Sequence, residues 1–167
     1  MKLTHTKLAL AVLFAALVMT SLGASAQWTA APSTCAVDED SIYYYQFSGS
    51  NFTINKTANG NVATVRCTVA NPMDSVGANP AWATLHLGYY DPGPNGYVKA
   101  YLWRASRTTF AYGLEAAIVS RDGVTAVDPG HVLHPFDFTN YLYFVTVEVQ
   151  RYSSAYSPGI AYNLALD

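Results

Sequence analysis

Apolar and polar residues alternate along several stretches of the chain, which is the pattern of a β-strand with one buried face. In NVATVRCTV, Ala63, Val65, Cys67 and Val69 fall on one face. The same period of two recurs in YLYFVTVEVQR and in the C-terminal IAYNLALD. Further strand candidates are residues 42–47, 52–55, 84–90 and 97–104. β-branched and aromatic residues are frequent in these stretches, which favours strands.

Segments rich in Gly, Pro, Asn, Asp and Ser separate the alternating stretches. They are SGSN, TANGN, NPMDSVGANP, DPGPNG, SRDG, DPGH and SSAYSPG. About eight or nine short strands at this spacing predict an all-β protein, an antiparallel β-sandwich or barrel, with a jelly-roll-like sandwich favoured. The stretch TTFAYGLEAAIVS is ambiguous, because its Ala, Leu and Glu residues favour a helical turn. Phe110, Tyr112, Leu114, Ala116 and Ile118 alternate within it, so we predict a strand.

The N-terminal segment has the three parts of a secretory signal peptide. Lys2 and Lys7 are basic, residues 8–19 are apolar, and residues 24–26 read Ala-Ser-Ala, a small-x-small cleavage site. The apolar run is too short for a transmembrane helix, which needs about 20 residues. We therefore predict a cleaved signal helix over residues 1–26 and a single domain over residues 27–167, secreted or periplasmic. No other stretch is long and apolar enough to span a bilayer as a helix.

Charge argues against nucleic acid as a partner. The chain has nine Lys and Arg residues against eleven Asp and Glu residues. Cleavage after residue 26 removes Lys2 and Lys7, so the mature chain would be more acidic still. Phosphate binding needs clustered basic residues, and the sequence has no basic run.

The two cysteines, Cys35 and Cys67, predict one disulfide bond in an exported chain. In the chain-entropy model, closing a loop of about 33 residues stabilises the fold by roughly 3–4 kcal/mol. Cys67 lies on the apolar face of its predicted strand, so the bond should be buried. The alternative, a reactive or metal-binding thiol pair, is disfavoured because the spacing is far from Cys-x-x-Cys.

Three adjacent acids, Asp38, Glu39 and Asp40, follow Cys35 closely and could bind calcium with Asp91 or Asp122. Their spacing differs from that of a calcium-binding loop, and adjacent side chains point in different directions. We predict that the triplet forms a solvated turn in which Asp40 or Ser41 caps backbone N–H groups. No cofactor is predicted, with calcium as the alternative.

The segment HVLHPFD places His131, His134 and Asp137 at intervals of three residues, and His86 could be a fourth ligand of zinc or copper. Pro135 forces extended or turn geometry on the residue before it. We interpret the segment as a loop rather than a metal site.

Aromatic residues are the most unusual feature of the composition, with 13 Tyr, three Trp and seven Phe. In YVKAYLWR, Val98, Ala100 and Leu102 suit a core face. The opposite face then carries Tyr97, Lys99, Tyr101 and Trp103. Sugar rings stack on flat aromatic platforms with nearby polar groups. We predict Tyr97, Tyr101 and Trp103 as ligand-binding residues, with Phe144 as an extension. The alternative is that these rings pack within the protein.

Hydrolytic chemistry has little support. The sequence contains neither a Gly-x-Ser-x-Gly nor a Ser-x-x-Lys motif. Glu115 and Glu148 lie in strand-like segments and could flank a glycosidic bond. An extracellular hydrolase is therefore the weakest of the function hypotheses.

The favoured hypothesis is a secreted, non-enzymatic binding or surface domain, with a glycan or another cell-surface component as partner. The alternative is a structural or assembly subunit of an extracellular layer or filament. In that case IAYNLALD or the leader QWTAAPST could be donated to the sheet of a neighbouring copy.

Four segments carry a resemblance to a known group of proteins: CAVDEDSIYYYQFSGSNFTI, ATVRCTVANP, NPAWATLHLGYYDPG and FDFTNYLYFVTVEVQR. With its acidic segment after a cysteine and its Asp-Pro-Gly turn, the chain resembles a group of small secreted bacterial all-β proteins. The resemblance covers most of the chain after residue 26. It implies export and an all-β fold, and it implies no activity and no catalytic residues.

Overall fold

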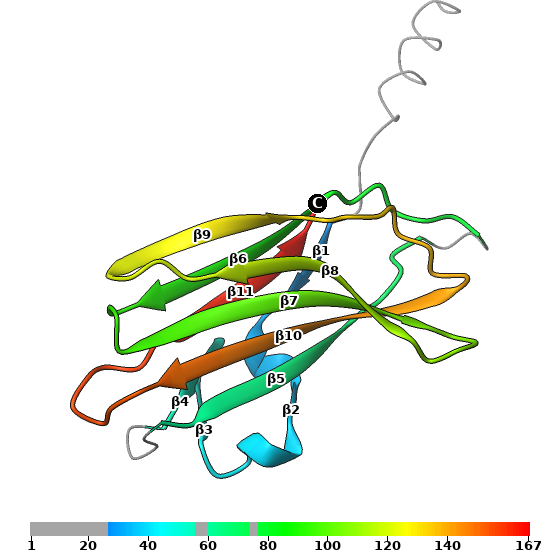
Figure 1. Ribbon diagram of the computed structural model, residues 1–167. Helices are drawn as coiled ribbons and strands as arrows, with labels where there is room; N and C mark the ends of the chain where they lie inside the picture. Colours follow the sequence, from blue (N-terminus) through cyan, green and yellow to red (C-terminus); the bar gives the residue numbers. More distant parts are fainter. Residues whose placement is uncertain (1–26, 56–59, 74–76) are drawn as a thin grey trace, which may run out of the picture.

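The computed structural model describes residues 27–55, 60–73 and 77–167 and places eleven β-strands within them (Figure 1). The predicted signal segment, residues 1–26, lies outside the described residues. The strands are β1 (Trp28–Ala30), β2 (Ala36–Val37), β3 (Tyr45–Ser48), β4 (Asn51–Ile54), β5 (Val62–Val69), β6 (Thr84–Asp91), β7 (Gly96–Ser106), β8 (Tyr112–Val119), β9 (Val124–His131), β10 (Tyr141–Arg151) and β11 (Ile160–Leu166). Two short 3₁₀ helices, η1 (Pro32–Thr34) and η2 (Glu39–Ser41), lie among the first strands.

The strands form two antiparallel sheets. One sheet has the order β3-β4-β11-β6-β9, with β1 also paired to β11, and the other has the order β2-β5-β10-β7-β8. From β4 onward the pairs are nested: β4 with β11, β5 with β10, β6 with β9 and β7 with β8. This nesting is the topology of a jelly roll, so the predicted antiparallel sandwich is confirmed, with eleven strands among the described residues where about eight or nine were expected.

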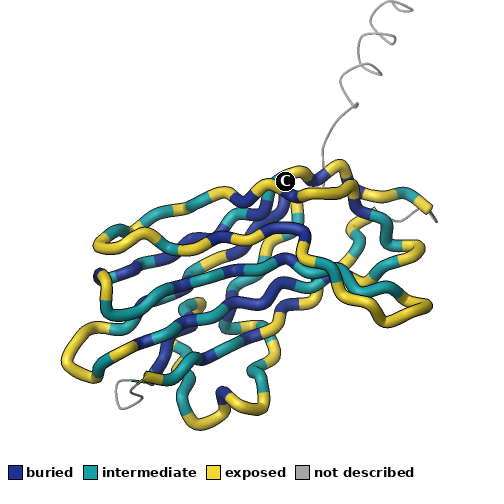
Figure 2. The backbone as a smooth tube through the Cα atoms, viewed as in Figure 1, coloured by how far each residue is buried: buried dark blue, intermediate teal, exposed yellow. Residues whose placement is uncertain are grey.

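The hydrophobic core lies between the two sheets and follows from the alternation in the sequence. On β7, Val98, Ala100 and Leu102 are fully buried. Valines at alternate positions of β10 and leucines of β6 and β11 are buried with them. Figure 2 shows buried positions recurring along these strands between partly exposed ones. Each fully buried Val or Leu side chain stabilises the fold by roughly 1.5–3 kcal/mol.

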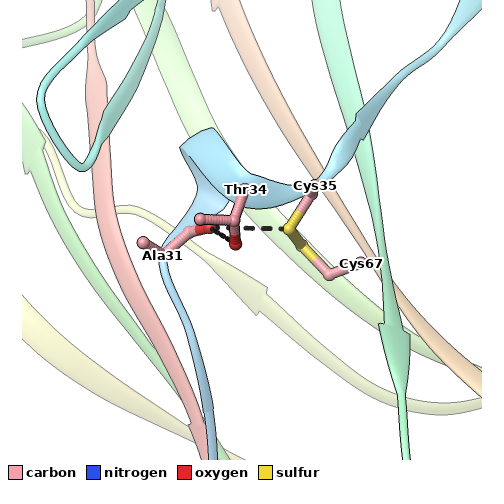
Figure 3. The surroundings of a disulfide bond; sticks show 4 residues. All are labelled: Ala31, Thr34, Cys35 and Cys67. Atoms are coloured by element: carbon pink, nitrogen blue, oxygen red, sulfur yellow. Dashed lines mark hydrogen bonds between the residues drawn. A yellow bond between two sulfur atoms is a disulfide. The ribbon is translucent and has the colours of Figure 1, made fainter.

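The predicted disulfide bond joins Cys35 to Cys67 (Figure 3). Cys35 follows η1, and Cys67 lies on β5 with 3 % of its surface exposed. The Cα atoms are 4.6 Å apart. In the turn before Cys35, the Thr34 hydroxyl donates a 2.8 Å hydrogen bond to the carbonyl oxygen of Ala31, which also lies 3.6 Å from the Cys35 sulfur. The bond thus fastens the N-terminal segment to the five-stranded sheet.

Strand β9 contradicts the prediction that DPGH forms a turn between strands. The segment is the end of β9, where Pro129 faces His86 of β6. Proline cannot donate to a central ladder, but β9 is an edge strand and has β6 as its neighbour on one side only. The predicted strand over residues 42–47 is also shorter than expected, because it begins only at Tyr45.

Strand β8 is a strand, as predicted, but its alternation is broken by a β-bulge. Leu102 of β7 faces Ala116, whereas the next residue, Trp103, faces Leu114, so Glu115 is the extra residue. Ala116 and Ile118 are buried as the alternation indicates, while Tyr112 and Leu114 are exposed. The bulge therefore moves the first half of the predicted apolar face to the surface.

Candidate functional site

The outer face of the five-stranded sheet carries the predicted aromatic row. Because the core residues of β7 point inward, Tyr97, Lys99, Tyr101 and Trp103 point outward and are half-buried. On the neighbouring β10, Phe144 lies opposite Trp103. Figure 1 shows β5, β10, β7 and β8 side by side, so these residues share one continuous surface.

A groove of about 1000 Å³ runs over this surface. Its aromatic lining includes Trp103, Phe144 and Tyr112, and its charged lining, within the described part of the chain, consists of Arg66, Arg107 and Glu148. A groove of this volume, with a largely apolar lining and a few polar groups, has the character of a small-molecule or oligomer binding site.

The rings in the groove are held in place by specific contacts. The Trp103 Nε1–H donates a 3.0 Å hydrogen bond to the hydroxyl of Thr146. Tyr112 packs edge-on against Phe144, with ring centroids 6.1 Å apart and an interplanar angle of 83°. The Arg66 guanidinium lies over the Phe144 ring, 5.3 Å from its centroid. These contacts fix the orientation of the rings, and the Arg66 guanidinium occupies part of the space over Phe144.

The three predicted ligand-binding residues are placed differently with respect to the groove. Trp103 lines it. Tyr101 lies next to Trp103, with ring centroids 6.1 Å apart, but is outside the lining. Tyr97 lies further along β7, where Lys99 Nζ is 3.6 Å from its ring centroid and Tyr152 packs edge-on against it. Tyr112 belongs to the groove and was missed because the bulge in β8 is not visible in the alternation.

The pKa values of Tyr97 and Tyr101, two phenols of the aromatic row, are raised above the ordinary value of 10. Burial, with a smaller contribution from the nearby Glu148 carboxylate, raises the pKa of Tyr97 to about 12. The pKa of Tyr101 is raised for the same two reasons. Both hydroxyls are therefore neutral and available as hydrogen-bond donors at physiological pH.

Glu148 is the acidic group of the groove, and burial raises its pKa above the ordinary value of 4.5. Lys99, its direct neighbour on β7, acts in the opposite direction. At pH values between the pKa of Glu148 in the unfolded state and its higher pKa in the folded state, the folded state binds more protons than the unfolded state. Glu148 therefore makes the protein less stable as pH rises through this range.

We expect Glu148→Gln to remove this pH dependence. The variant's free energy of unfolding, relative to that of the original protein, should increase as pH rises from about 4.5 through the raised pKa. Urea denaturation of both proteins at pH 4, 5, 6 and 7 measures the difference. A difference that stays constant over this range would contradict the expectation.

Glu115 and Glu148, the pair considered for hydrolysis, are not brought together. Glu148 lines the outer groove, whereas Glu115 is 1 % exposed and contacts groups on the inner side of the sheet. Arg104 Nε lies 2.8 Å from one oxygen of Glu115. His134 donates its backbone N–H to the other oxygen at 3.1 Å and places its ring Nδ1 2.9 Å from it.

The acidic triplet forms the turn that the sequence predicts, with a different capping residue. Asp38 precedes η2 and accepts a 3.3 Å hydrogen bond from the backbone N–H of Asp40. The other carboxylate oxygen of Asp38 lies 3.5 Å from Arg66. The Ser41 hydroxyl accepts the backbone N–H of Thr64 on β5 at 2.8 Å, so it ties the turn to the sheet instead of capping it.

The residues considered for a zinc or copper site have separate partners. His134 contacts Glu115, His86 Nε2 lies 3.0 Å from the carboxylate of Asp167, and Asp137 accepts backbone N–H groups of its own turn. Among residues 27–55, 60–73 and 77–167, no group of three or more His, Cys, Asp or Glu side chains could hold a metal ion.

The two segments considered as donor strands are both paired within the chain. β1, from the leader, pairs with Leu164–Leu166 of β11. β11 pairs with β6 on one side and with β4 and β1 on the other. Donation to another copy would thus require opening these pairs. In the part of the chain that the structure describes, no helix has the length and apolar character needed to cross a membrane.

Comparison with known proteins finds similarity among solved structures. No protein-family model matches the sequence, and no curated protein matches it. Among solved structures, the chain is similar to a family two carbohydrate esterase from Cellvibrio japonicus, with 11 % sequence identity and a TM-score of 0.38. The similarity covers 84 % of this chain and 32 % of that chain. This chain therefore spans about a third of the length of that esterase.

Proposed function

We propose that the protein is an exported, non-enzymatic carbohydrate-binding domain whose ligand lies in the groove over β5, β10, β7 and β8. The observation that carries the proposal is the set of solvent-facing rings, Trp103, Phe144 and Tyr112, that line one groove of about 1000 Å³. Apolar faces of sugar rings stack on such side chains, which contribute large contact areas with little loss of conformational entropy.

Polar groups beside the rings suit a ligand rich in hydroxyls. Thr64, Thr68 and Glu148 line the same groove and can exchange hydrogen bonds with sugar hydroxyls. Trp103 already uses its N–H on Thr146, so its indole face rather than its edge is the binding surface. Stacking and hydrogen bonding are thus available together in one groove.

Export agrees with the disulfide bond, because such bonds form and persist in oxidising compartments. We extend the proposal to a secreted or periplasmic location, as the resemblance to small secreted bacterial proteins implies. A glycan at a cell surface or in the surroundings is the partner that this location makes accessible.

Trp103→Ala is expected to abolish measurable glycan binding, because it removes the largest ring of the groove and the hydrogen bond that orders Thr146. Tyr101→Ala should weaken binding less, since Tyr101 only flanks Trp103. Tyr97→Ala, at the far end of the aromatic row, is the matched control and should have the smallest effect.

The measurement is a glycan-array screen of the oxidised protein covering residues 27–167, followed by titration calorimetry on each variant. The screen is run with and without calcium, which also tests the acidic triplet. If Tyr101→Ala and Trp103→Ala both leave glycan affinity unchanged, the proposed location of the binding site is wrong.

A further inference from the structure

Positive charge gathers at the groove although the chain as a whole is acidic. The sequence has eleven acidic and nine basic residues. The groove reverses this balance among the described residues that line it, because Arg66 and Arg107 lie there with one carboxylate, Glu148. Glu148 in turn lies directly opposite Lys99 on the neighbouring strand, which offsets its charge. A ligand in the groove therefore meets a net positive surface.

Arg66 is positioned to bind an anion above the aromatic floor. Its guanidinium lies over the Phe144 ring and 3.5 Å from Asp38. The pair with Asp38 is solvent-exposed, with 57 % of the Arg66 side chain accessible, so it contributes little energy. A guanidinium has five N–H donors in a planar fork, and those not directed at Asp38 can bind a carboxylate or sulfate group.

Arg107 supplies a second cation at the other end of the groove. It lies in the turn between β7 and β8, where its backbone N–H donates to the carbonyl oxygen of Asn140 at 3.0 Å. Arg66, on the other side of β10, faces Thr146, which is six residues after Asn140 in the chain. At about 3.4 Å per residue this separates the two backbone positions by roughly 20 Å, which is longer than a single sugar ring.

We infer that the groove binds an acidic polysaccharide, a polymer whose sugars carry carboxylate or sulfate groups. Arg66 and Arg107 pair with anionic groups on different sugars of one chain, while the ring of Trp103 stacks against a sugar face between them. This inference rests on the proposed carbohydrate-binding function and adds the charge and the polymeric nature of the ligand.

The test compares acidic polymers with their neutral counterparts. Polygalacturonate is paired with carboxyl-reduced polygalacturonate, and dextran sulfate is paired with dextran. Affinity electrophoresis and titration calorimetry should show at least tenfold tighter binding to one or both acidic polymers than to the matched neutral polymer. That affinity should fall as salt rises from 50 to 500 mM, because exposed charge interactions are screened. The two pairs distinguish carboxylate from sulfate as the recognised group.

Arg66→Gln and Arg107→Gln should each lower the affinity for the acidic polymer about tenfold or more, which corresponds to the loss of one charge-assisted hydrogen bond. Arg66→Lys should restore part of it. Arg121→Gln removes a surface charge outside the groove lining and should leave affinity unchanged, which controls for net charge. Circular dichroism confirms the fold of each variant.

The outcomes separate the two proposals. The inference is overturned if neutral polymers bind as tightly as acidic ones. If binding is then lost in Trp103→Ala and kept in Arg66→Gln, the proposed function stands. Acidic binding that survives both arginine substitutions also overturns it. Absence of binding to every polymer and every arrayed glycan overturns both proposals.

Discussion

Replacing Arg104 with methionine should lower the free energy of unfolding by about 3 kcal/mol, because it leaves the Glu115 carboxylate buried without its main counter-ion. Glu115 is 1 % exposed, and Arg104 Nε lies 2.8 Å from its carboxylate. Breaking a buried ion pair from one side typically costs about 3–5 kcal/mol. The lower end applies here because Arg104 is 27 % exposed. For a domain of this size the loss corresponds to a decrease in Tm of roughly 10 °C.

Urea denaturation and thermal unfolding measure the loss of stability. Two further variants test whether it comes from the unpaired carboxylate. Arg121→Met breaks an exposed ion pair with Asp128 and should cost less than about 1 kcal/mol. Combining Arg104→Met with Glu115→Gln removes the unpaired charge and should recover part of the stability. An Arg104→Met variant as stable as Arg121→Met would show that Arg104 does not support the buried carboxylate.

The strand around Glu115 could be predicted only in part from the sequence. The alternation of Phe110 through Ile118 correctly predicts a strand, and its second half, Ala116 and Ile118, is buried. A β-bulge adds one residue without altering the local pattern of apolar and polar positions, so neither the inward turn of Glu115 nor the exposure of Tyr112 could be read from the sequence. Both depend on pairing with β7, which is a tertiary contact.

The same distinction separates the predicted part of the groove from the rest. The outward direction of Trp103 and Phe144 follows from the period of two within each strand. Their adjacency, and that of Arg66, depends on the order β5-β10-β7, which brings together residues far apart in the chain. The alternation in the sequence predicts on which face of its strand a residue lies, whereas the strand order determines which residues are its neighbours. Strand β9 was missed for a related reason, since Pro129 signals a turn unless the strand is known to be at an edge.

Removing the disulfide with Cys35→Ala and Cys67→Ala should lower the free energy of unfolding by roughly 3–4 kcal/mol, because the unfolded chain regains the entropy of an open loop. The two residues are 32 positions apart in the sequence. Equilibrium urea denaturation of the double variant measures the loss, and the original protein with its disulfide reduced is the control that changes no residue. Agreement between the two would assign the effect to the bond itself, whereas a loss below about 1 kcal/mol would contradict the loop-entropy account.

The disulfide variant also connects stability to the groove. Cys35 leads into β2, which pairs with Val65 and Arg66 of β5, and Asp38 follows directly to contact the Arg66 side chain. Without the bond, this short edge segment is attached to β5, among the described residues, by its two residue pairs and by the hydrogen bonds of Asp38 and Ser41 with Thr64, so Arg66 should become less well ordered. Trp103 and Phe144 lie on β7 and β10, which pair over eleven residues and do not depend on the bond. We therefore expect the double variant to lose affinity for acidic polymers while keeping the stacking surface. Equal loss for acidic and neutral polymers would instead indicate disruption of the whole sheet.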